Sequence, residues 1–392
     1  MEAGNQTKPV GNAGAAASPA ADGARDNATG KNTSEAYVVM DAMRCVLAVA
    51  VAFAHAWYLL IEDYRGEAST IAAIGYFLAG FAHASVILFF VLSGYWIAKS
   101  VDRRMIVGWE WSGYLVDRLA RLLVVLLPAL AIGGSLDAIG LYGLESATHT
   151  GATNTYVLGN DVADRLGWRV LLGNVLFLQD IAVAPFGTNG PLWSLAYEFW
   201  FYIWFPAIVV SWRKRRLSPF LVAASIAWIA PHMLIGFACW LCGAVLFWTT
   251  NRSRHESRPR RSRLRLLVAT IAFVGMLIFV RTVGLGGAEL PLAVSFALLL
   301  YALLHAEVIA PRWLKPLAAY GATASFSLYV LHFPLIAFAA ALLLDDRRWP
   351  ASGTSIALVI AVLAAVVLLS AIFARHTERH TSRVRTLFSG SR

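Results

Sequence analysis

Long apolar runs alternate with short polar segments along most of the chain. Eight of these runs approach or exceed the roughly 20 residues that carry a helix across a bilayer. They cover residues 37–61, 71–97, 122–139, 192–212, 264–280, 290–305, 318–344 and 356–373. A backbone in hydrocarbon must satisfy its own hydrogen bonds, so each run predicts a transmembrane helix. The pattern therefore predicts an all-α polytopic membrane protein.

A ninth apolar stretch, at 217–249, is interrupted by Pro231 and His232. Basic clusters precede it at 213–216 and follow it at 252–265. Because basic loops remain on the cytoplasmic side of a membrane, both ends of this stretch are expected on the same side. That requires an even number of crossings, so the stretch is interpreted as two short helices.

This interpretation brings the prediction to about ten transmembrane helices, with both termini in the cytoplasm. The apolar segment at 171–183 is too short to span and contains polar side chains, so a re-entrant or interfacial element is predicted there. The remaining loop charges agree, because the acidic connections at 62–67 and 345–346 fall on the side opposite the basic ones.

Composition supports the same class of protein. Of the 392 residues, 58% are hydrophobic and 14% are charged, and the mean hydropathy is +0.62, which excludes a soluble domain. The net charge of +10 comes from clusters between apolar runs, which indicates topology signals and no nucleic-acid surface. Residues 1–34 are predicted to be a disordered tail, 35–374 the transmembrane domain and 375–392 a basic cytoplasmic tail.

All three cysteines lie inside apolar runs. Cys239 and Cys242 form a CxxC pair, but there is no second pair and no histidine at ligand spacing. They are interpreted as packing residues, and no metal site is predicted.

The first apolar run contains three ionisable side chains, Asp41, Arg44 and His55. Each such side chain inside a bilayer costs about 3 kcal/mol, which makes it a candidate functional residue. Asp41 and Arg44 are three residues apart and are expected to pair. Arg44 and His55 are eleven apart, so they share one helix face at depths about 16 Å apart. By themselves they also fit a snorkelling arginine and a histidine bonded to a neighbouring helix.

Further motifs follow in order along the chain. Arg44 and His55 are followed by a Phe-Phe-Val-Leu-Ser-Gly-Tyr run at 89–95 and by Arg118 and Arg121. A Trp-Ser-Leu segment at 193–195 precedes Glu198 and Tyr202, and a Ser-Leu-Tyr-Val-Leu-His element covers 327–332. Each motif is weak alone, but the ordered set closely resembles the acyltransferase-3 family of membrane-bound acyltransferases.

The resemblance implies an enzyme in the cytoplasmic membrane of a bacterium. Members of the family transfer acyl groups, commonly acetyl, from cytoplasmic acyl-CoA to hydroxyls of carbohydrates or glycolipids. It implies acyl-CoA as co-substrate, no permanently bound cofactor, and a lipid bilayer as the surroundings.

The resemblance also implies roles for individual residues. His55 is expected as the general base, with Arg44 and Glu198 as further catalytic residues. The expected acyl-CoA contacts are Arg44, Arg118, Arg121, Ser93 and Gly94, and the expected acceptor contacts are Trp193, Ser194, Tyr202, Tyr329 and His332. Glu198 is expected at the depth of His55, where a carboxylate orients the ring or binds the sugar.

Several of these residues also fit purely structural explanations. Arg118 and Arg121 also fit ordinary positive-inside anchoring, Ser93 and Gly94 fit helix packing, and the aromatic residues fit an interfacial belt. A rival function is a proton-coupled transporter or flippase in which His55, Glu198 and His332 form a relay. No internal repeat supports that rival.

Overall fold

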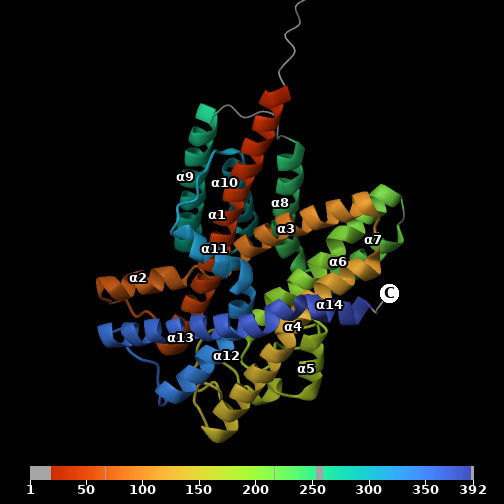
Figure 1. Cartoon of the computed structure of the whole chain (residues 1–392). Helices are drawn as coiled ribbons and strands as arrows, with labels where there is room; N and C mark the ends of the chain where they lie inside the picture. The colour runs from red at the N-terminus through yellow and green to blue at the C-terminus, as the bar shows by residue number, and fades with distance from the viewer. Residues whose placement is uncertain (1–18, 67, 216, 253–258, 390–392) are drawn as a thin grey trace, which may run out of the picture.

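The computed structural model describes residues 19–66, 68–215, 217–252 and 259–389 as helices joined by loops (Figure 1). Within these ranges there is no strand, and the sheet-like pairs are isolated bridges such as that between Ile61 and Trp349. The all-α prediction is therefore confirmed. The α-helices are α1 (Pro19–Leu60), α2 (Thr70–Ala79), α3 (Ala82–Val107), α4 (Trp111–Ala138), α5 (Trp168–Val175), α6 (Trp193–Lys214), α7 (Ser218–Ile229), α8 (Met233–Arg252), α9 (Pro259–Val283), α10 (Glu289–His305), α11 (Leu314–Thr323), α12 (Ser325–Leu343), α13 (Gly353–Thr377) and α14 (Thr381–Ser389).

Eight stretches among the described helices are long and apolar enough to cross a membrane. They are Glu35–Leu60, Ala82–Val107, Trp111–Gly143, Gly190–Lys214, Met233–Asn251, Ser262–Val283, Ser325–Leu343 and Gly353–Thr386. Helix α10 has 17 residues and α7 has 12, both shorter than these. The number of ten spans and the cytoplasmic location of the termini stay predictions, as does the division into tail, domain and tail. Residues 1–18 of the predicted tail lie outside the described residues.

Two runs predicted as single helices are broken in the structure. The run at 71–97 divides into α2 and α3 at Gly80, where Arg281 of α9 donates to the carbonyl oxygens of Phe77 (2.8 Å) and Tyr76 (2.9 Å). The run at 318–344 divides into α11 and α12 at Ala324. Gly321 of α11 lies directly on the backbone of α1 at Asp41, where a side chain would collide. Both breaks depend on contacts between distant helices, which hydropathy does not reveal.

The stretch at 217–249 does divide into two helices, α7 and α8, with the break at Pro231. Helix α7 packs against α6, whereas α8 packs against α3 and α10. At the break, Nε2 of His232 lies 3.1 Å from the carbonyl oxygen of Asp180. The predicted pair of helices is confirmed, although the two do not pack on each other. The predicted non-spanning segment at 171–183 contains only the end of α5, an eight-residue helix.

Ion pairs join helix ends that carry the basic clusters. Arg213 at the end of α6 lies 3.0 Å from Asp102 of α3, and Arg385 of α14 lies 2.6 Å from Asp117 of α4. Helix α14 lies across α4 (Figure 1). These contacts place the ends of α3, α6 and α14 and the start of α4 on one side, which we call the basic side. The opposite side carries the ends of α1 and α12 and the start of α6, and we name it the outer side after the predicted topology.

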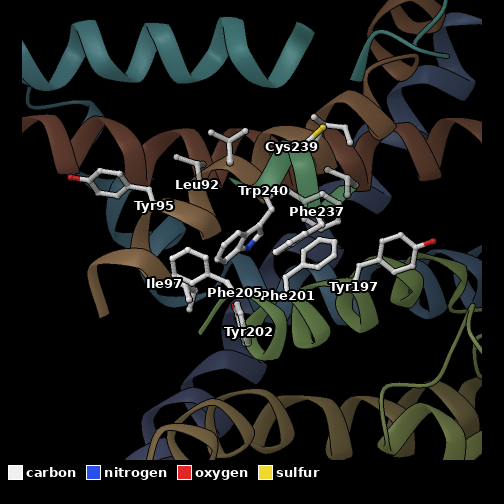
Figure 2. Close-up of a cluster of buried hydrophobic side chains, with 14 of the residues drawn as sticks. Leu92, Tyr95, Ile97, Tyr197, Phe201, Tyr202, Phe205, Phe237, Cys239 and Trp240 are labelled. Carbon is white, nitrogen blue, oxygen red and sulfur yellow. The ribbon is translucent and has the colours of Figure 1, made fainter. Parts of the chain in front are cut away.

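Helices α3 and α8 approach each other unusually closely. A β-carbon at Gly94 would collide with the carbonyl oxygen of Trp240, and one at Gly243 with that of Val91. Small residues allow such backbone contact between membrane helices, where dispersion and not hydrophobicity drives association. The close pair supports an aromatic core between α6 and α8, in which the Phe205 and Trp240 ring centroids are 5.1 Å apart, beside buried Cys239 (Figure 2).

Candidate active site

A cavity of about 470 Å³ lies between α1, α3, α4, α6, α11 and α12. Its polar lining residues are Asp41, Arg44, Ser93, Ser100, Arg103, Arg118, Arg121, Ser194, Glu198, Tyr202, Ser325 and Tyr329. This volume falls in the range of small-molecule sites. The cavity therefore collects most of the polar side chains that the motifs singled out.

Arginines dominate the charge of this cavity. Arg44, Arg103, Arg118 and Arg121 line it, against the two carboxylates of Asp41 and Glu198. Arg103 and Arg121 are exposed, whereas Arg44 and Arg118 are half-buried, so positive charge extends from the surface inward. Forked guanidinium groups suit phosphate oxygens, which accept two parallel hydrogen bonds. The cavity is thus built to receive an anion from the basic side.

Two of the arginines have defined partners. Nη1 of Arg44 lies 3.7 Å from Oδ1 of Asp41, which confirms the predicted pair on α1. Nη2 of Arg118 donates to Oγ of Ser100 (2.8 Å). The carboxylate of Asp41 and the hydroxyl of Ser100 therefore hold these guanidinium groups against the cavity wall.

Glu198 is held by donors from α3 and α6. Oγ of Ser93 donates to Oε1 of Glu198 (2.8 Å), and the hydroxyl of Tyr202 donates to the same oxygen. Nε1 of Trp240 in turn donates to Oγ of Ser93 (3.3 Å). The carboxylate oxygen with two donors keeps a fixed direction, and Glu198 contributes negative charge opposite Arg44.

Ser194 and Tyr329 line the part of the cavity farthest from the basic end of α6. Their hydroxyl oxygens lie 2.5 Å apart, and the Tyr329 hydroxyl also donates to the carbonyl oxygen of Pro191 (3.1 Å). On α3 the lining residues run from Val86 to Arg103, a rise of about 25 Å. The cavity therefore extends from the basic side along most of α3.

A histidine pair lies one turn beyond Tyr329. Nδ1 of His55 on α1 lies 2.8 Å from Nε2 of His332 on α12, and the rings are stacked at 18°. The centroids of the Tyr329 and His332 rings are 5.8 Å apart. The pair thus connects the first of the eight apolar stretches to the seventh, Ser325–Leu343. It lies next to Tyr329, which lines the arginine-lined cavity.

The hydrogen bonds order the protons of this pair. Nδ1 of His332 lies 2.8 Å from the carbonyl oxygen of Tyr329 and 3.1 Å from that of Leu328, and carbonyl oxygens only accept. Nδ1 of His332 therefore carries a proton. With one proton on each ring, Nε2 of His332 accepts from Nδ1 of His55, and Nε2 of His55 keeps its lone pair. That nitrogen has no hydrogen-bond partner within the described ranges.

Several predicted site residues do not lie where the sequence analysis expected them. The expected contact between Glu198 and His55 is not found within the described chain, where His332 occupies that place. Gly94 faces the backbone of α8 and not the cavity. Trp193 packs at a ring distance of 5.8 Å from His83 and does not line the cavity. Tyr202 and Tyr329, expected at the acceptor, lie in the arginine-lined cavity.

Arg103 is a cavity residue that the sequence reasoning missed. It lies in the last part of α3, in a basic segment whose charges were taken only as topology signals. The available clue was spacing: Arg103 is ten residues after Ser93, so it lies almost three turns farther along the same helix.

The fold and the cavity define an integral membrane protein with an internal cationic site that lies beside a histidine pair. A family profile described as an acyltransferase domain matches residues 37–375, so the chain belongs to the acyltransferase-3 family. The resemblance inferred from the motifs is confirmed, and the protein is an acyltransferase. No curated protein and no solved structure matches the chain.

Proposed function

We propose that this protein transfers an acyl group, acetyl in the simplest case, from cytoplasmic acyl-CoA to a hydroxyl of a carbohydrate or glycoconjugate. The observation that carries the proposal is the arginine-lined cavity, whose lining residue Tyr329 has its ring 5.8 Å from that of His332 in the histidine pair. In a chain of an acyltransferase family, such a cavity is suited to an anionic, elongated acyl donor.

The donor enters from the basic side. Coenzyme A carries several phosphate charges. The exposed Arg103 and Arg121, at the mouth of the cavity, bind these phosphates. Arg44 and Arg118 follow deeper in the cavity. The uncharged pantetheine arm then extends along the cavity, so that the thioester lies near Ser194 and Tyr329. Their hydroxyls are the nearest cavity donors for its carbonyl oxygen.

His55 acts as the general base. Its Nε2 removes the proton of the acceptor hydroxyl as that oxygen attacks the thioester carbonyl carbon. The new C–O bond forms, the C–S bond breaks, and the thiolate of coenzyme A leaves with its electron pair. The proton on Nε2 then passes to the thiolate, which restores the enzyme.

His332 positions that base. Its Nδ1 is fixed as a donor by the Tyr329 carbonyl, so its Nε2 holds the ring of His55 in the tautomer with a free Nε2. In the Ser-His-Asp triad of hydrolases, a carboxylate holds the catalytic histidine in the required tautomer. Glu198 is assigned to the donor side, where it faces Arg44 and fixes the hydroxyl of Tyr202.

The test uses purified full-length protein in nanodiscs with radiolabelled acetyl-CoA and a panel of sugar acceptors. We expect label transfer by wild type, and loss of transfer in His55→Ala. His305→Gln is the matched control, because Nδ1 of His305 makes a similar bond (2.8 Å) to the carbonyl oxygen of Tyr301 but no bond to a second histidine.

Absence of transfer and of free coenzyme A release in wild type, with no thermal protection by acetyl-CoA, would refute the proposal. Proton-coupled transport driven by a His55, Glu198 and His332 relay would then be the function to examine. Within the described residues no hydrogen bond joins Glu198 to either histidine, which counts against that relay.

A further inference from the structure

A second set of hollows lies at the outer ends of α1 and α2, apart from the arginine-lined cavity. Two adjoining hollows of about 400 and 500 Å³ share Glu62, Asp63 and Tyr76 as walls. No residue of either lines the arginine-lined cavity. We call them together the outer cleft, defined by Trp57, Tyr58, Glu62, Asp63, Tyr64 and Tyr76.

Aromatic rings form one wall of the outer cleft. The Tyr76 ring meets that of Trp57 edge to face at 5.1 Å and that of Tyr64 at 5.3 Å. The Tyr76 hydroxyl donates to the carbonyl oxygen of Glu62 (2.8 Å), which holds the ring in place. Tyr64 is 56% exposed, so its ring is available to a ligand.

Trp57 is a buried member of this wall. Its side chain is 1% exposed, and its indole N–H has no partner in the described part of the chain. Buried tryptophan N–H groups normally find a partner. Because this N–H is itself buried, Trp57 contributes its ring to the wall and does not offer a donor at the surface of the cleft.

Carboxylates form the facing part of the outer cleft. Arg348 binds Asp63 through two bonds, of 2.8 and 2.7 Å, and also donates to the carbonyl oxygen of Ile61 (3.1 Å). Asp63 is nevertheless 69% exposed, so its oxygens remain available as acceptors. Glu62 lies beside it, paired at 3.6 Å with the exposed Arg65.

The outer cleft adjoins the proposed base. Tyr58 is three residues after His55 on α1, which places it one turn farther out, a rise of about 4.5 Å, and about 60° around the helix. Its ring packs at 4.9 Å from Tyr156 of the long outer loop. A molecule in the outer cleft therefore approaches His55 from the side opposite the basic end.

We propose that the outer cleft binds the carbohydrate acceptor, with a pyranose stacked on Tyr64 and its hydroxyls bonded to Glu62 and Asp63. A pyranose has an apolar C–H face and a rim of hydroxyls, which match an aromatic wall opposite carboxylates. This assignment rests on the proposed function. It moves the body of the acceptor away from Trp193, Tyr202 and Tyr329, and leaves only the reacting hydroxyl near His55.

The experiment measures sugar binding separately from catalysis. Saturation-transfer NMR is recorded on full-length protein in nanodiscs with methyl glycosides of glucose, galactose, rhamnose and N-acetylglucosamine. We expect saturation transfer with wild type and a loss of about fivefold or more in Tyr64→Ala and Glu62→Gln. Tyr142→Ala is the matched control, since Tyr142 is 69% exposed on the outer side but does not line the outer cleft.

Each outcome decides the assignment. No saturation transfer in wild type, or equal transfer in Tyr64→Ala and Tyr142→Ala, overturns the outer cleft as an acceptor site. Thermal protection by acetyl-CoA is measured on the same samples and is expected to be unchanged in both cleft variants. Sugar binding that depends on Tyr64 without acetyl-CoA protection would support the cleft and refute the proposed donor.

Discussion

Nδ1 of His55 lies 2.8 Å from Nε2 of His332, although the two residues are 277 positions apart in the chain. The bond links the first span to α12 and leaves Nε2 of His55 as the free nitrogen of the pair. The two histidines therefore have unequal roles, and their substitutions should differ in effect.

The first prediction separates the base from the residue that positions it. His55→Ala should lower kcat by about 10³-fold, within the range of general-base removal. His332→Ala should lower kcat by about ten- to a hundredfold, because the base remains but its orientation and tautomer are no longer fixed. KM for acetyl-CoA should stay near the wild-type value in both. Equal losses in His55→Ala and His332→Ala, with the same KM, would contradict the unequal roles.

The second prediction concerns the mouth of the arginine-lined cavity. Arg103→Ala and Arg121→Ala should each raise KM for acetyl-CoA about tenfold, because each removes a charge-assisted contact to phosphate. The effect should shrink as salt rises, since both side chains are exposed. Arg312→Ala is the control, an exposed arginine outside the cavity. An unchanged KM in Arg121→Ala would leave that arginine as a topology signal only.

The third prediction tests the close contact of α3 and α8. Gly94→Ala should destabilise the protein by about 1–3 kcal/mol, because the added methyl group collides with the carbonyl oxygen of Trp240. Gly275→Ala in α9 meets no atom within 4 Å and should be neutral or stabilising. Melting temperatures in one detergent compare the two. Equal temperatures would show that α3 and α8 do not pack as closely as described.

The fourth prediction is a pH dependence at the outer side. Hydrogen bonds from Arg348 hold the pKa of Asp63 below its usual value of 3.8. A carboxyl group with a lowered pKa contributes stability above its unfolded pKa and loses it as the pH falls through the folded pKa. Melting temperature should therefore fall below about pH 4, and less so in Asp63→Asn. Asp346→Asn, an exposed carboxylate without an ion pair among the described residues, should keep the wild-type acid dependence.

The fifth prediction tests the orientation in the membrane. In a variant without native cysteines, Arg263→Cys at the start of α9 should react with an impermeant maleimide only from the cytoplasm. His232→Cys at the break before α8 should react only from outside, because it lies beside Asp180 of the outer loop. Labelling of Arg263→Cys from outside would reverse the charge-based topology.

Much of the secondary structure followed from the sequence because lipid allows few backbone solutions. Apolar runs of sufficient length must become helices, so α6 and α13 were predicted close to their observed positions, whereas α1 and α4 begin well before the predicted runs. The break at Pro231 was also predicted, since the charges on both flanks required two crossings. The pair of Asp41 and Arg44 needed only helical spacing.

Tertiary structure decided what the spacing along one helix does not contain. Hydropathy is uniform through a run, so it did not reveal the breaks at Gly80 and Ala324, which follow from contacts with α9 and α1. Depth alone suggested Glu198 as the partner of His55, but depth says nothing about which faces of two helices meet. The packing of α12 on α1 brought His332 there instead.

The sequence by itself determined that this chain crosses a membrane repeatedly, that it resembles the acyltransferase-3 family, and that Arg44 and His55 share a helix face. These properties are local, because they depend on side-chain transfer into lipid and on helical geometry. Only the tertiary structure decided that the arginines line one cavity, that His55 bonds to His332, and that aromatic and acidic residues meet in an outer cleft. Those arrangements depend on close packing between helices, which hydrophobicity does not direct inside a bilayer.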